Sequence, residues 1–277
     1  MTSSELAPAR AATAERSALT AILEFGGQVR AVAAAEFRKL RHDPLELLLR
    51  AVQPMLWLLL FGQVMARIRG LSGTGLDYLD FLSAGILAQS VLFTAIFYGI
   101  SAIWERDLGI LHRYLVSPAY RPALVMGKAL SAALRGLSQA VIIYALALLL
   151  GLGINLMPAH IVGAILFVAL GAMLFSTLSL IMACLVRTRE RFMGIGQVLT
   201  MPIFFASNAI YPIELMPDWL KVIARFNPLT YEVDALRALM LTSSSSAFGL
   251  GTDAAIMAAV FFVLMLVAAR LYPRMVT

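Results

Sequence analysis

The sequence has little charge for its length. Asp, Glu, Lys and Arg make up 14% of the 277 residues, whereas 61% are hydrophobic, and the mean hydropathy is +0.85. Soluble domains carry about 25% charged residues, because charged side chains cover the surface that faces water. A soluble fold of this size could not cover its surface with so few of them. The composition therefore predicts an integral membrane protein.

Cysteine, histidine and the common catalytic motifs are also scarce or absent. Cys184 has no partner for an intrachain disulfide, and the three histidines share no metal-ligand spacing with it. The sequence contains no HExxH pair, no GxSxG turn and no Walker loop, since Gly127-Lys128 is followed by Ala129. We expect no metal site, no bound cofactor and no catalytic residues in this chain.

Long apolar runs are abundant. A run of about 20 residues crosses about 30 Å of hydrocarbon, and six such runs lie near 47–66, 79–102, 124–150, 161–186, 193–212 and 253–271. The sequence therefore predicts an all-α, polytopic membrane protein with six transmembrane helices. Residues 1–27 are expected to form a disordered tail, and the first run is expected to act as an uncleaved insertion signal.

The basic residues lie at the ends of these runs rather than on one face with aromatic readers, which argues against a nucleic-acid partner despite a net charge of +6. Seventeen of the 22 Lys and Arg residues fall in the two tails and the connections after the second and fourth runs. Because cytoplasmic segments carry the excess of basic residues, both termini are predicted to be cytoplasmic.

Residues 28–43 form an amphipathic pattern ahead of the first run. Val29, Ala33, Phe37 and Leu40 fall on one helical face, with arginines elsewhere. This pattern is typical of an interfacial helix at the cytoplasmic membrane surface. Such a helix could be a plain anchor or could clamp a cytoplasmic partner, and the pattern favours neither.

The connection at 103–122 is too patterned for a spacer. Leu108, Leu111 and Leu115 recur at helical spacing, and Pro118 and Pro122 each end a helix. A short cytoplasmic helix with one apolar edge could be an interfacial elbow. It could equally dock in a groove of a soluble subunit.

A second irregular segment, at 213–241, is divided by Pro217 and Asn227-Pro228 into two short pieces. Apolar pieces of 10–14 residues are too short to span and are read as re-entrant or interfacial helices. Asp234 and Arg237 are three residues apart and share one face. At the outer leaflet, this pair of helices would cap a pathway from outside.

The middle portions of the six runs lack acidic residues, and ionisable residues inside the membrane are the usual mark of ion-coupled carriers. They carry uncharged polar residues instead, among them Gln89, Gln139 and Gln197. Without an acid in the spans no proton or sodium relay is evident, so energy for any transport is expected to come from the cytoplasmic side.

Two motifs resemble a known family. The first is E-R-D-x-G-x-L-x-R-x-L-x-x-S-P at Glu105–Pro118, and the second is M-P-D-W-L followed by N-P-L-T-Y-x-V-D-A-L-R-A at Met216–Ala238. With the order of helices around them, they resemble the permease subunits of the ABC transporter type 2 family, of the daunorubicin-resistance and nodulation-factor exporter types.

The resemblance implies roles for particular residues. The residues that match the helix that couples to the ATPase are Glu105, Arg106, Gly109, Leu111, Leu115 and Pro118. The residues that match the extracellular gate are Asn227, Pro228, Tyr231, Asp234 and Arg237. The family usually has an acidic residue near His112, and this chain has none there, which puts one contact with the ATPase in doubt.

The resemblance also implies partners: a separate ATP-binding subunit that holds ATP and Mg²⁺, and a second copy of this permease or a homologous one in the lipid bilayer. Six packed helices leave little room for a passenger, so a lumen between two copies is expected. The residues expected to line this lumen are Gln89, Phe93, Gln197, Phe204, Phe205 and Asn208. Amides among aromatic rings suit an amphiphile.

The predicted function is thus the permease subunit of an ATP-driven exporter for a drug, antibiotic, lipid or glycolipid, in the cytoplasmic membrane of a bacterium, as in multidrug resistance. The first alternative is an exporter permease for a polysaccharide or lipid-linked glycan. The second, from another class, is a membrane enzyme or scaffold that acts without nucleotide.

Overall fold

The computed structural model describes residues 52–67, 77–109, 121–186 and 188–272, together with positions 26, 27 and 34. The predicted interfacial helix at 28–43, almost all of the tail at 1–27, and residues 110–120 of the elbow lie outside these ranges. Within the described ranges the elements are helices, apart from an isolated antiparallel bridge between Ile154 and Leu241. The all-α prediction is confirmed for this part of the chain.

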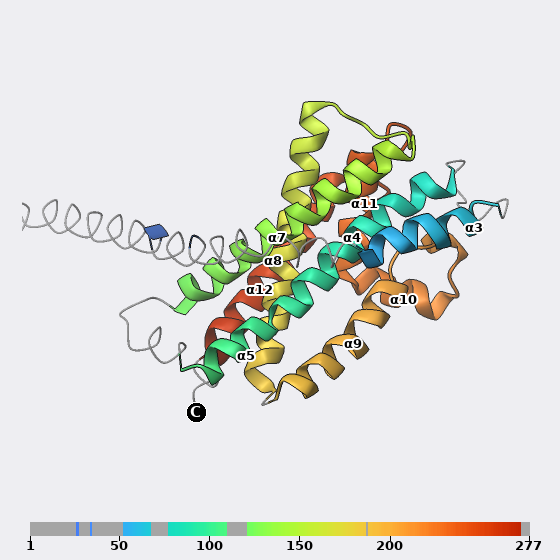
Figure 1. The fold of residues 1–277 in the computed structure, drawn as a ribbon. Coiled ribbons are helices and arrows are strands. Elements are labelled where there is room, and N and C mark those ends of the chain that lie inside the picture. Colours follow the sequence, from blue (N-terminus) through green and yellow to red (C-terminus); the bar gives the residue numbers. More distant parts are fainter. Residues whose placement is uncertain are drawn as a thin grey trace, which may run out of the picture.

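Among the described residues, four helices are long and apolar enough to cross a membrane (Figure 1). They are the 30-residue helix Tyr78–Asp107, made of α4 (Tyr78–Tyr98) and α5 (Ile100–Asp107), then α7 (Arg121–Leu149), α8 (Pro158–Leu185) and α12 (Leu250–Leu271). Helix α8 packs against α4, α7 and α12 and forms the centre of the bundle. These helices correspond to the second, third, fourth and sixth predicted spans.

Of the two remaining predicted spans, the first is described only from residue 52, and the second is shorter than expected. The apolar helix Val52–Met65, which includes the π-helical η1 (Trp57–Gly62) and α3 (Gln63–Met65), stands where 47–66 was predicted. In place of 193–212, α9 (Arg189–Phe205) ends after 17 residues. Pro202 lies in its last turn and has no N–H for the helical ladder, and the chain turns at 206–211. Six full-length spans are therefore not confirmed.

The segment between α9 and α12 contains the 3-10 turn η2 (Ile213–Leu215) and two short helices, α10 (Asp218–Phe226) and α11 (Pro228–Met240). The break between the two helices falls at Asn227, as the sequence predicted. Helix α10 exposes an apolar face of Trp219, Val222, Ile223 and Phe226. In contrast, α11 is buried along nearly its whole length.

Helix α11 runs antiparallel to α8 inside the bundle. Near its C-terminal end Leu239 lies against Gly163, and two turns earlier Glu232 lies against Gly171. The backbone N–H of Asn155, in the α7–α8 connection, donates to the carbonyl of Met240 at 2.7 Å. A segment with the sequence of a surface connection is thus packed among the long helices.

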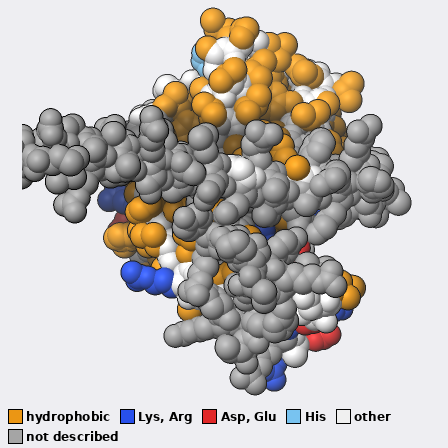
Figure 2. Space-filling view, turned by 90° about the vertical axis from the view of Figure 1, so that its left-hand side faces the viewer, with side chains coloured by type: hydrophobic (Ala, Val, Ile, Leu, Met, Phe, Trp, Pro, Cys, Tyr) orange, Lys and Arg blue, Asp and Glu red, His pale blue; other side chains and the backbone are white. Residues whose placement is uncertain are grey.

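The outward faces of the long helices are apolar. Large hydrophobic side chains of α7, α8 and α12 are exposed, among them Val141, Leu149, Leu166 and Phe262. Figure 2 shows hydrophobic side chains covering the upper part of the molecule, with Lys and Arg side chains below it. Because an exposed apolar surface of this extent is unfavourable in water, it indicates contact with lipid.

Candidate functional site: a polar pocket and two helix-end clusters

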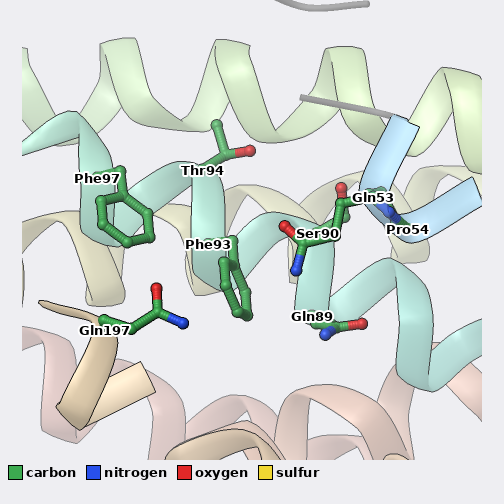
Figure 3. A pocket seen from close by; sticks show the side chains of 8 residues that line it. All are labelled: Gln53, Pro54, Gln89, Ser90, Phe93, Thr94, Phe97 and Gln197. Atoms are coloured by element: carbon green, nitrogen blue, oxygen red, sulfur yellow. The ribbon is translucent and has the colours of Figure 1, made fainter. Parts of the chain in front are cut away.

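A pocket of about 250 Å³ opens beside α4. Helix α4 supplies Gln89, Phe93 and Phe97, which are spaced four residues apart and therefore lie on one face. Gln197 of α9 faces them, and Gln53 comes from the helical segment before η1 (Figure 3). The remaining lining residues are Pro54, Ser90 and Thr94.

The polarity of the pocket comes from amides and hydroxyls, since none of the eight lining residues is charged. The side-chain oxygen of Gln89 is buried and has no hydrogen-bond partner among the described residues. The hydroxyl of Ser90 donates to Gln139 of α7 at 3.0 Å, which ties this wall to the bundle. The pocket thus combines aromatic surface with amides that can orient a ligand without a fixed charge.

The pocket brings together three of the six residues expected in the lumen: Gln89, Phe93 and Gln197. The other three lie elsewhere. Phe204 is buried, with its ring centroid 6.1 Å from that of Trp57, and Phe205 is partly exposed beside it. Asn208 is buried in the turn after α9, and its carbonyl accepts from Arg237. A role in transport for all six stays a prediction.

Beyond the pocket, at the end of the bundle formed by α5, a buried ion pair joins α5 to α7. The Nζ of Lys128 lies 2.7 Å from the Oε2 of Glu105, and both side chains are almost fully buried. Glu105 was expected to belong to the surface that contacts the ATPase. The structure places it between two helices, so any contribution of Glu105 to coupling would pass through this ion pair.

A second cluster joins the end of α5 to the start of α9. Asp107 accepts hydrogen bonds from both Arg106 and Arg189, and the Arg189 guanidinium lies 3.7 Å from the centre of the Trp104 ring. Arg106 also donates to the carbonyl of Val186. The second and third cytoplasmic stretches predicted from charge therefore meet here.

The 30-residue helix that ends at Asp107 is about 45 Å long, which exceeds the roughly 30 Å of hydrocarbon. Arg106 and Asp107 follow the apolar run at 79–102 that is predicted to cross the membrane, so this charged end is expected to lie beyond the membrane-crossing part. Slight burial acts to raise the pKa of Asp107, but hydrogen bonds and attraction from Arg106 and Arg189 outweigh it and hold that pKa below its ordinary value.

Gly109 ends α5 with a φ of +69°, a left-handed conformation that favours glycine. The chain can turn sharply at this point, as the family resemblance implies for the start of the coupling region. The remaining predicted coupling residues, Leu111, Leu115 and Pro118, lie outside the described residues, as does His112.

The predicted gate residues lie at both ends of α11. The side chain of Asn227 accepts from the N–H of Leu229 at 3.0 Å and donates to the carbonyls of Ile203 and Ala206 at 2.7 and 2.9 Å. It therefore caps α11 and holds it to the end of α9. Pro228 is the first residue of α11, where its missing N–H costs nothing.

Tyr231 and Asp234 bind the chain on either side of α11. The hydroxyl of Tyr231 donates to the carbonyl of Arg225 at 2.6 Å. One oxygen of Asp234 accepts from the N–H groups of Ala247 and Phe248 and from the hydroxyl of Ser246. These bonds fix α11 to the segments that enter and leave it.

Arg237 does not pair with Asp234, although the two share a face. Its guanidinium donates to the carbonyl of Asn208 at 2.7 Å and lies 3.7 Å from the centre of the Phe81 ring on α4. The hydroxyl oxygen of the same Ser246 also lies 3.0 Å from a carboxylate oxygen of Asp253 on α12. The five predicted gate residues are therefore brought together as one packed unit on α11.

Sequence reasoning missed the burial of Glu232 and Asp253. It looked for ionisable groups only in the middle of the apolar runs, and α11 is not such a run. The structure places Glu232 inside the bundle and buries Asp253 in the first turn of α12, whose preceding residues are exposed. The inference that no acid lies inside the membrane domain is therefore wrong.

Comparison with known proteins adds a decisive observation. The sequence profile described as "ABC-2 type transporter" matches residues 27–241, which is most of the chain. The chain belongs to the ABC-2 type transporter family.

Two relatives agree with this assignment. The chain is 30% identical to a transport permease ycf38 of Cyanophora paradoxa over 210 residues, covering 75% of this chain and 72% of that protein. It is 28% identical to nodulation protein J of Rhizobium leguminosarum bv. trifolii over 199 residues, covering 68% of this chain and 71% of that protein.

Membership in the ABC-2 family explains the architecture. The chain is the membrane subunit of a transporter, a multi-pass permease and not itself an enzyme. Since ABC-2 permeases work with an ATP-binding subunit, the absence of a Walker loop from this sequence is accounted for. The family thereby explains why the chain combines many apolar helices with charged clusters at one end.

Proposed function

We propose that this permease moves an amphipathic compound, such as a drug, antibiotic, lipid or glycolipid, out of the cytoplasm when a separate subunit hydrolyses ATP. The observation that carries this proposal is the pocket of three glutamines and two phenylalanines beside α4. Its lining favours a passenger with both apolar and hydrogen-bonding groups and disfavours a bare ion, which would need charged or densely polar ligands.

Two copies would complete the passage. The pocket of about 250 Å³ is smaller than the 300 Å³ or more typical of sites for drug-sized ligands. On α9, Val198 and Met201 are exposed beside the pocket residue Gln197. A second permease packed against this face would bury the exposed side chains and enlarge the pocket into a lumen between the copies.

The chain is proposed to have six membrane-crossing or membrane-embedded elements besides the pair α10–α11, with both termini in the cytoplasm. The helix pair α10–α11 is proposed to be re-entrant from the outer side. Three observations support this: the antiparallel course of α11 along α8, the bond between Met240 and the α7–α8 connection, and the deep position of Asn227 against α9. The outer end of α11 would then shape the exit.

Coupling is proposed to run through residues 103–122. Movement imposed on this elbow by the ATP-binding subunit would reach α7 through the Glu105–Lys128 ion pair and α9 through Asp107 and Arg189. The route through Arg189 leads to α9, which carries Gln197, and the elbow also continues through α5 into α4, so movement of the elbow would reach two walls of the pocket.

The experiment is export of a fluorescent amphiphile from cells that express this permease with its cognate ATP-binding subunit. Gln197→Leu and Phe93→Ala are expected to reduce export several-fold and to change the order of preference among passengers. Val141→Ala, on the lipid-facing side of α7, is the matched control and should leave export unchanged. If both pocket variants export every tested compound as the parent does, the pocket does not bind the passenger.

A further inference from the structure

Within the part of the chain that the structure describes, the carboxyl group of Glu232 lies inside the bundle without a hydrogen-bond partner. Glu232 on α11 is 0% exposed, and neither of its carboxylate oxygens has a hydrogen-bond partner among the described residues. Both oxygens lie directly against Gly171 of α8, where an added Cβ would overlap with them. The two helices can approach this closely, with the carboxyl group between them, only because position 171 has no side chain.

The depth of this contact follows from the position of Gly171. It is the fourteenth of the 28 residues of α8, so it lies about 20 Å along the axis from each end of a helix that crosses the membrane. The carboxyl group of Glu232 therefore lies near the middle of the membrane domain.

The charged neighbours of Glu232 on α11 itself are engaged elsewhere. Asp234 is bound by Ser246 and two backbone N–H groups, Arg237 is held by a backbone carbonyl and the Phe81 ring, and the Tyr231 hydroxyl donates to Arg225. None of them forms a hydrogen bond or ion pair with the Glu232 carboxyl.

The helices that pack against α11 offer no closer partner. On α8, His160 and Cys184 lie about 16 and 20 Å along the axis from Gly171. On α12, Asp253 is bonded to Ser246, and Arg270 lies in the last turn. The titratable groups of α4 lie in its first and last turns and are Tyr78, Asp80 and Tyr98. Those of α10 lie on a helix with a mostly exposed surface and are Asp218, Lys221 and Arg225.

An ionised carboxylate in such a place would be very unfavourable. Moving an unpaired charge out of water into an apolar interior costs far more than protonating it, so the group stays neutral instead. A neutral carboxylic acid, by contrast, is a small polar group that the gap at Gly171 accommodates. The packing of α11 on α8 is thus compatible with one protonation state only.

We propose that Glu232 is a proton-binding site at the middle of the membrane domain, protonated while α11 packs on Gly171 and ionised when α11 separates from α8 and water enters. Proton binding then favours the packed state, and proton release accompanies movement of α11. This site belongs to the permease alone, so its test needs neither an ATP-binding subunit nor a passenger and can fail independently of the proposed function.

The test is the melting temperature of the purified permease as a function of pH, for the parent and for Glu232→Gln. In the unfolded chain Glu232 titrates near pH 4.3. Above that pH the folded parent holds one proton more than the unfolded chain, so its stability falls as pH rises until the folded group also ionises. Relative to Glu232→Gln, the parent should lose on the order of 3 °C per pH unit in this window.

Infrared spectroscopy provides the direct readout. At neutral pH the parent should show the carbonyl stretch of a buried protonated acid, and Glu232→Gln should lose that component. Glu190→Gln, at an exposed position of α9, is the matched control and should retain both the band and the pH slope of the parent.

Two results would overturn the proposal. In the first, the parent and Glu232→Gln show equal pH slopes and the same acid band. In the second, Glu232→Gln fails to fold, because an amide has the shape of a neutral acid and is expected to fit where the protonated group fits.

Discussion

Glu105 on α5 and Lys128 on α7 form a buried ion pair with 2.7 Å between Oε2 and Nζ. The pair lies at the end of the bundle where the elbow begins, and it connects the helix that continues α4 with the helix that follows the elbow. Burial makes it sensitive to the loss of one partner, because the other charge would be left in the interior uncompensated.

Replacing one member of this pair is expected to destabilise the permease strongly. Glu105→Gln or Lys128→Met should each lower the free energy of unfolding by about 3–5 kcal/mol. The double variant should be clearly more stable than the sum of the two single effects predicts. Thermal unfolding of the four proteins in detergent measures this coupling, and strictly additive effects would show that the pair does not join α5 to α7.

Asn227 is expected to be irreplaceable even by its closest relative. Asn227→Ala removes three buried hydrogen bonds and should cost about 2–4 kcal/mol. Asn227→Asp keeps the acceptor for Leu229 but turns an oxygen toward the carbonyls of Ile203 and Ala206, so it should be at least as damaging. Unfolding measurements in which Asn227→Asp matched the parent would contradict this account of the contact between α11 and α9.

Gly85 is expected to reject even a methyl group. An added Cβ would overlap with the carbonyl oxygen of Ala209, which belongs to the buried turn after α9. Gly85→Ala should therefore lower the melting temperature by several degrees. Gly194→Ala is the control on α9, because nothing lies within 4 Å of its added Cβ. It should be neutral or slightly stabilising, and equal effects of the two variants would mean that α4 does not approach the turn this closely.

The cluster around Asp107 is expected to loosen in acid. Since the pKa of Asp107 in the folded protein is lowered, its contribution is present above the unfolded pKa of about 3.9 and is lost as pH falls through the folded value. Arg189 would then leave the Trp104 ring. In the parent, tryptophan fluorescence should change as pH falls through this acidic range. Asp107→Asn should show the altered fluorescence already at neutral pH, and a Trp104→Phe protein should lack the transition. A transition that survives Trp104→Phe would contradict this assignment.

The long helices could be predicted from the sequence because hydropathy alone decides them. The run at 124–150 became α7 (Arg121–Leu149), and the run at 253–271 became α12 (Leu250–Leu271). In these segments most residues are apolar, and contact with lipid or with another helix suits most of them equally. The mean hydropathy over a window of residues therefore represents the free energy that favours these helices in the membrane.

The shorter elements depend on packing that a window average does not represent. Helix α9 was extended to residue 212 because its apolar residues continue, but Pro202 and the turn held by Asn227 end it earlier. Helix α11 contains Glu232, Asp234 and Arg237, which lower its mean hydropathy and favour a surface position. Its burial depends on particular partners, such as Gly171, that lie far away in the sequence.

The candidate site was predicted in part for the same reason. Gln89 and Phe93 share a face through helical spacing, which the sequence displays directly. Their meeting with Gln197 of α9 and Gln53 of the first helix depends on the way three segments pack. Glu105 was predicted as a coupling residue, and its ion-pair partner Lys128 lies 23 residues further along and could not be chosen from spacing alone.

The most direct measurement of the central claim is uptake into sealed vesicles that contain the permease, with and without its cognate ATP-binding subunit. The account predicts that a fluorescent amphiphile accumulates only when both subunits and ATP are present, and that a proton or sodium gradient alone drives nothing. Accumulation by the permease alone under an ion gradient would contradict it.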